Sequence, residues 1–109
     1  MDGWRVEVLN DIVRAEIEAL PEDIRAHLAH IIEMMVAVGP ERMRAPHVKP
    51  LREKLWEMRM HGRDGIARAI YIAVRGRRVV ILHAFVKKTQ KTPPQAIRLA
   101  LRRAKELEA

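Results

Sequence analysis

Two apolar segments joined by a short turn constrain the fold more than any other feature of the sequence. Residues 66–74 are rich in isoleucine and apolar apart from Arg68, and residues 79–86 are apolar on both alternating faces. The basic residues 75–77, with glycine in the middle, are typical of a tight turn, so the two segments are predicted to form a β-hairpin. A strand that is apolar on both faces is typically covered on both sides, which predicts that residues 79–86 lie in the centre of a sheet.

The rest of the chain is predicted to supply two further strands and three helices. Alternation of apolar and polar residues predicts strands at residues 4–9 and 55–60. Apolar residues at helical spacing predict one helix after Asn10, a second that begins at Pro21 and a third after Thr92.

Two of these helices carry capping signals. Asn10 is suited to cap the first helix, and Thr92 and Gln95 have the spacing of a capping box for the third. The elements fit a single domain over residues 1–109 of the α+β class. We expect a small antiparallel sheet of about four strands, an N-terminal helical hairpin and a C-terminal helix, with the helices packed largely on one face.

Charge is distributed unevenly along the chain. Residues 1–40 contain three arginines and eight acidic residues, a net charge of −5, whereas residues 41–109 carry +12. A basic part of this kind favours a polyanion as partner, while the acidic part would repel phosphates and fix the orientation on a nucleic acid. The alternative is a basic protein whose scattered charges are only solvated.

Several classes of protein are excluded by residues that the sequence lacks. It has no cysteine and no serine, which excludes a disulfide framework and a thiolate or serine nucleophile. It has no glycine-rich phosphate loop, no membrane-length apolar run and no secretory signal pattern, so we expect a cytoplasmic protein without a membrane partner. His27, His30 and Glu33 share a helix face, but no fourth ligand is apparent, and we expect neither a metal nor a cofactor.

Arg68 is the most informative cation because it interrupts the apolar face of its strand. A charge buried there without a partner is costly, so either that face is open to solvent or a ligand, or Arg68 pairs with Glu57 across the sheet. Lys87, Lys88 and Lys91 follow the last strand beside a helix N-terminus, which suits a phosphate as well as a solvated strand end.

His83 lies within the predicted central strand. A histidine in such a place is either a hydrogen-bonded residue of the core or a catalytic residue, and both interpretations remain open.

Three segments resemble one protein family. Residues 55–59 (LWEMR), 68–71 (RAIY) and 81–93 (ILHAFVKKTQKTP) are similar to the phage-derived, HigB-like branch of the RelE/ParE toxin superfamily. The order of strand, helical hairpin, three strands and closing helix also occurs there. The resemblance implies the toxin of a type II toxin–antitoxin pair, usually a ribosome-dependent endoribonuclease that cleaves messenger RNA and is silenced by a helix-turn-helix antitoxin.

The resemblance also implies a site made of cations. In the RelE branch an arginine on the strand after the glycine-containing turn contacts the phosphate; Arg68 matches it, and Lys87 and Lys88 lie near the place of further catalytic cations. RNA binding is expected of a wider set of residues: Lys54, Arg59, Arg63, His83 and Lys91. Leu55 and Glu57 stand where RelE itself has lysines, so the general acid and base are not assigned.

Two other functions remain open. The ParE branch shares the fold but inhibits DNA gyrase, and a non-catalytic module that only binds nucleic acid would carry the same charge. Mapping of cut messenger RNA beside a DNA supercoiling assay separates these three functions.

Overall fold

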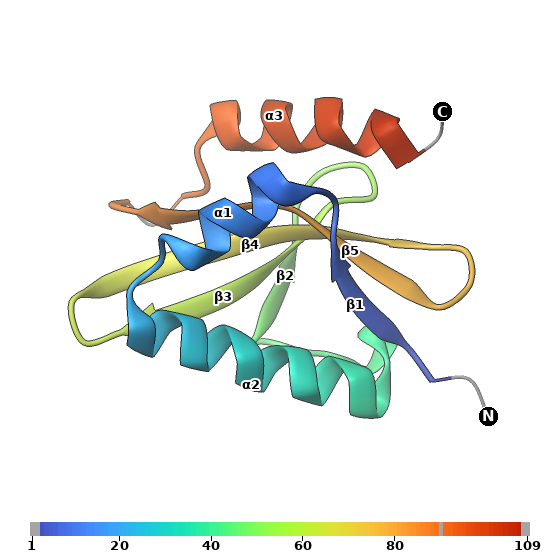
Figure 1. The fold of residues 1–109 in the computed structure, drawn as a ribbon, viewed down its shortest axis with the longest axis horizontal. Coiled ribbons are helices and arrows are strands. Elements are labelled where there is room, and N and C mark those ends of the chain that lie inside the picture. Colours follow the sequence, from blue (N-terminus) through green and yellow to red (C-terminus); the bar gives the residue numbers. More distant parts are fainter. Residues whose placement is uncertain (1–2, 90, 108–109) are drawn as a thin grey trace.

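A five-stranded β-sheet lies between two layers of helices (Figure 1). The computed structural model describes residues 3–89 and 91–107. Its strands and α-helices in chain order are β1 (Arg5–Val8), α1 (Asp11–Glu18), α2 (Glu22–Val38), β2 (Val48–Pro50), β3 (Trp56–Gly62), β4 (Gly65–Val74), β5 (Arg78–Lys87) and α3 (Pro94–Ala104). Short 3-10 helices span Pro40–Arg42 and Lys105–Leu107.

The strand order is β1-β5-β4-β3-β2, and all neighbouring strands are antiparallel except β1 and β5, which are parallel. The α+β class is thereby confirmed, and β5 is an interior strand, flanked by β1 and β4, although β4 and not β5 is the middle strand. The expectation of about four antiparallel strands is wrong in two details. β1 runs parallel to β5 because it is not joined to it by a hairpin but reaches it across most of the chain. β2 is not among the predicted strands, yet an edge strand tolerates Pro50, which has no N–H to donate.

The helices cover both faces of the sheet, with α2 on one side and α3 on the other (Figure 1). The prediction that they lie largely on one face is therefore wrong for α3. Val80 and Leu82 give β5 a second apolar face, and Ala96 and Ala100 of α3 pack against it in a separate core. This face of the sheet also carries the candidate site.

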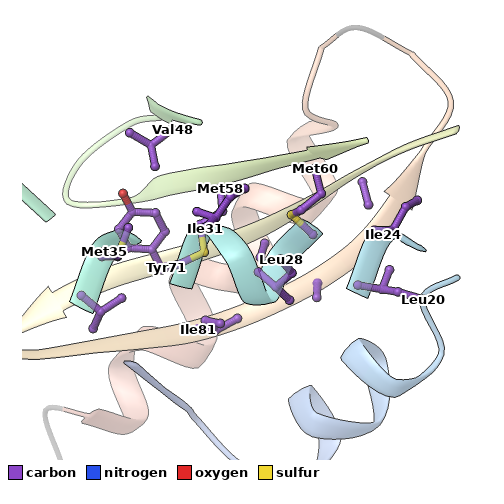
Figure 2. Close-up of a cluster of buried hydrophobic side chains, with 14 of the residues drawn as sticks. Leu20, Ile24, Leu28, Ile31, Met35, Val48, Met58, Met60, Tyr71 and Ile81 are labelled. Carbon is purple, nitrogen blue, oxygen red and sulfur yellow. The ribbon is translucent and has the colours of Figure 1, made fainter. Parts of the chain in front are cut away.

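The larger core lies between α2 and the sheet (Figure 2). α2 contributes a buried stripe at intervals of three or four residues: Ile24, Leu28, Ile31 and Met35. The alternation along β3 places Met58 and Met60 in this core, as predicted. Glu57 and Arg59 are consequently turned towards the α3 side.

Asn10 caps α1, its Oδ1 accepting a hydrogen bond from the backbone N–H of Val13 at 3.0 Å, and this prediction is confirmed.

Among the helices of the described residues, none combines the length and the apolarity needed to cross a membrane. No group of three or more histidine or acidic side chains within residues 3–89 and 91–107 is arranged to hold a metal ion.

Two hydrogen bonds hold the N-terminal half of α2 to the β3–β4 hairpin. The backbone N–H of His61 donates to Nδ1 of His27 at 3.0 Å, and that of Arg63 donates to Oδ2 of Asp23 at 2.6 Å. Gly62 lies between them, where a Cβ atom would come within 2.6 Å of the same carboxylate oxygen. Burial, with the nearby His61 ring, lowers the pKa of His27, so the fold favours the neutral ring that can accept this bond.

Acid is therefore expected to destabilise the protein through His27. Because the pKa of His27 in the fold lies below its ordinary value of 6.5, its stabilising contribution is complete above that pH and is lost as the pH falls through the lowered value. Thermal unfolding between about pH 8 and about pH 5 measures the loss. A His27→Asn variant keeps an acceptor that does not titrate and should show a flatter dependence, whereas His30→Asn, exposed on the same helix, should not. Identical profiles for His27→Asn and the unaltered chain would assign the effect to other groups.

Candidate functional site

Four charged side chains from three neighbouring strands meet on the face of the sheet that α3 covers. Glu57 and Arg59 belong to β3, Arg68 to β4 and Lys87 to β5, and together they form the Glu57 cluster. Arg59 lies directly opposite Arg68 in the register, and Lys87 lies opposite Ile66, two residues from Arg68. Residues opposite one another or two apart share a face, so strand alternation brings these groups together.

Glu57 is the centre of this cluster and is only 2% exposed. Its Oε2 lies 3.4 Å from Nε of Arg68 and 3.8 Å from Nε of Arg59, and its Oε1 accepts a hydrogen bond from the hydroxyl of Thr92. Arg68 is itself 4% exposed, and its NH1 donates to the carbonyl oxygen of Ala67 at 2.9 Å. Of the two alternatives for Arg68, the structure has the ion pair with Glu57 and not an open face.

The Thr92 hydroxyl serves the cluster and not the helix. The predicted capping box is wrong, because α3 starts at Pro94 with Pro93 as its N-cap and without a side-chain cap. Two prolines at the start of a helix remove two of the N–H groups that a cap would satisfy. Thr92 is therefore available to bond Glu57, and it ties the start of α3 to β3.

Lys87 is the buried amine of the cluster. Its side chain is 4% exposed. Burial lowers the pKa of Lys87, and the charge of Arg68 lowers it further, with smaller contributions from Arg59 and Lys49, while Glu57 opposes the shift. Arg68 is therefore the principal charged neighbour of Lys87.

The Glu57 cluster reaches the surface along the β2 side of the sheet. Arg59 is 30% exposed, and Lys49 on β2, directly opposite Glu57, is exposed. The positively charged side chains thus extend from the buried Arg68 and Lys87 to the more exposed Arg59 and Lys49. The sequence did not single out Lys49, because it lies in a segment with three prolines for which no strand was predicted. Only its register opposite Glu57 would have revealed it.

The other predicted site residues are not all gathered here. Lys88 and Lys91 are exposed and follow β5 directly, on the segment that leads from Lys87 to Thr92. Arg63 lies in the β3–β4 turn, where its backbone bonds α2, and Lys54 lies before β3 at the opposite end of the sheet face.

His83 belongs to a different network, which joins α1, β5 and α3. Its Nδ1 lies 2.9 Å from Oε1 of Glu16, whose Oε2 lies 2.9 Å from NH2 of Arg103, and its ring stacks on Phe85. The Glu16 pKa is lowered, since the bonds from Arg103, His83 and the Ala84 N–H outweigh its burial, which acts the other way. His83 is thus half-buried and bonded, the first of its two interpretations.

Comparison of the chain with known proteins identifies its family. The family described as Phage derived protein Gp49-like (DUF891) matches residues 15–105. Two relatives, both named "Probable endoribonuclease HigB1" and from Mycobacterium tuberculosis strains CDC 1551 / Oshkosh and ATCC 25618 / H37Rv, are each 33% identical over 94 residues, covering 86% of this chain and 72% of the relative.

A solved structure has the same fold. The archaeal RelE–RelB complex from Pyrococcus horikoshii OT3 contains a chain that is 19% identical, with a TM-score of 0.56, covering 79% of this chain and 96% of that one. At this identity the likeness concerns the fold alone. The family match and the relatives confirm the resemblance found in the sequence, and the chain belongs to the Gp49-like family of phage-derived proteins.

Proposed function

We propose that the protein is the toxin of a type II toxin–antitoxin pair and an endoribonuclease that cleaves messenger RNA on the ribosome. The single observation that carries the proposal is the Glu57 cluster, in which Arg59, Arg68 and Lys87 share one sheet face. The proposal is supported by the two relatives named as probable endoribonucleases and by the fold shared with a RelE chain. RNA is a polyanion, which agrees with the charge of +12 on residues 41–109.

The proposed chemistry is transfer of a phosphate to the neighbouring 2′-hydroxyl. The 2′-oxygen attacks phosphorus as a base takes the proton of the 2′-hydroxyl, and the bond to the 5′-oxygen breaks with its electron pair. The 5′-oxygen takes a proton from an acid or from water, which leaves a 2′,3′-cyclic phosphate and a 5′-hydroxyl. Lys87 is proposed as that base, since a lowered pKa gives it a neutral amine more readily. Arg68 stabilises the charge on the phosphate, and Lys88 assists on the exposed segment after β5.

RNA is proposed to approach from the β2 side. Arg59 and Lys49 meet the backbone there, and Lys91 adds a charge beyond Lys88. Lys54, Arg63 and His83 lie away from this route, so their expected part in RNA binding is not included in the proposed site.

The partner is proposed to be an antitoxin encoded beside the gene, of the helix-turn-helix type. An antitoxin is supported by the fold shared with a chain of the RelE–RelB complex, while the helix-turn-helix type rests on the sequence resemblance. No cofactor is proposed for the reaction.

Induced expression with and without the neighbouring reading frame tests the proposal. We expect growth arrest and newly cut messenger RNA when the chain is expressed alone, and relief of both when the neighbouring product is present. Intact messenger RNA together with blocked DNA supercoiling would show that the protein is a gyrase inhibitor and not a nuclease. RNA that is bound but not cut in a purified translation reaction would show that the protein is a non-catalytic binding module.

A further inference from the structure

A cavity of about 1050 Å³, the α3 groove, opens at the end of the sheet face remote from the Glu57 cluster. Its lining residues include the C-terminal part of α3 and the β4–β5 hairpin. The cluster lies at the start of α3, where Thr92 bonds Glu57, whereas the α3 residues that line the groove are Leu101 and Ala104. On the β3 side the groove includes Leu55, two residues before Glu57.

The α3 groove has an apolar floor. The side chains that make it come from the start of β3, the end of β4 and the end of the chain: Leu55, Ile72, Val74, Leu101, Ala104 and Leu107. No aromatic residue is among the described residues that line it, so it offers no surface on which a nucleobase could stack. An apolar floor of this kind suits the apolar side of a peptide better than it suits RNA.

The rim of the α3 groove is cationic. Arg75 and Lys105 are exposed on it, and Lys54 adds a third exposed charge against a single acid, Glu53. Arg78 also lines the groove, but its NH2 is paired with Glu7 at 2.7 Å. A partner that covers the floor must therefore bring negative charge to the rim.

We propose that the α3 groove binds an acidic amphipathic segment of the antitoxin. The proposal rests on the function proposed above and specifies where that partner docks. Apolar side chains of the segment lie on the floor, and its carboxylates meet Arg75 and Lys105. Because the groove and the Glu57 cluster lie at opposite ends of α3, binding here anchors the antitoxin without using the residues assigned to RNA cleavage.

The test compares two charge-reversal variants of the full chain. Arg75→Glu with Lys105→Glu alters the rim, and Arg25→Glu with Arg98→Glu makes the same change in charge at exposed positions outside the groove. Each is coexpressed with the tagged product of the neighbouring reading frame, and affinity and growth are measured. We expect the rim variant to bind about tenfold more weakly or worse, and to arrest growth even when the partner is present. Leu107→Asp, on the floor, should weaken binding similarly.

The outcomes separate this inference from the proposed function. If the unaltered chain does not bind the neighbouring product, the antitoxin partner is wrong and this inference falls with it. If the unaltered chain and the rim variant bind equally, the groove assignment alone is wrong, and equal weakening by Arg25→Glu with Arg98→Glu also overturns it. Loss of RNA cleavage in the rim variant would make the groove an RNA site, and loss of a dimer in light scattering would make it a site for a second copy.

Discussion

Replacing Glu57 with leucine is expected to lower the free energy of unfolding by about 3–5 kcal/mol, the loss typical of breaking a buried ion pair from one side. The change leaves the Arg68 guanidinium, 4% exposed, without the carboxylate 3.4 Å away, and leaves Arg59 and the Thr92 hydroxyl without their acceptor. For a chain of 109 residues each kcal/mol corresponds to roughly 4 °C, so thermal unfolding should show a fall of roughly 10–20 °C.

Two controls separate charge from packing at this position. Glu18→Leu makes the same change at an exposed position of α1 and should leave the unfolding temperature nearly unchanged. Glu57→Leu combined with Arg68→Met removes both charges and should recover most of the loss, because apolar residues can replace a buried ion pair at little cost. If the double variant instead lost the sum of what Glu57→Leu and Arg68→Met each lose alone, the two residues would act independently.

Local patterns of the sequence predicted the elements that depend on local contacts. Alternation identified β1 and β3, apolar segments identified β4 and β5, and the period of two turned Arg59 and Arg68 to one face. The apolar character of β5 on both sides indicated an interior strand. The cap of α1 was predictable because Asn10 and Val13 are three residues apart. The core of the candidate site therefore follows from period-two alternation and a short turn.

Contacts between distant residues were not predictable in the same way. Thr92 bonds Glu57 across 35 positions, and Glu16 bonds His83 across 67, so neither pairing leaves a periodic signal. The sheet has two apolar faces, and the composition of the sequence does not show which of them α3 packs against. For the same reason the sequence grouped Lys54 with the RNA-binding residues, although the fold places it on the α3 groove.

Substituting Arg68 is expected to reduce RNA cleavage by about 100- to 1000-fold in kcat, as loss of a single charge-stabilising donor does in other enzymes. Arg68→Ala alone would be ambiguous, because it leaves the buried Glu57 carboxylate without the guanidinium 3.4 Å away. Arg68→Met with Glu57→Gln removes the guanidinium without leaving a buried carboxylate, and should fold yet fail to cut messenger RNA. Lys88→Ala, at an exposed position, should lose less than about tenfold.

Arg68→Lys decides whether the arginine serves the fold or the reaction. Lysine restores a positive charge beside Glu57 but lacks the planar guanidinium group, which can donate two hydrogen bonds to one phosphate. If Arg68 contacts the phosphate, this variant should unfold at nearly the original temperature while its cleavage of messenger RNA stays low. If Arg68 only neutralises Glu57, stability and cleavage should return together, and the phosphate would have to be held by cations nearer the surface, Arg59 and Lys49 first among them.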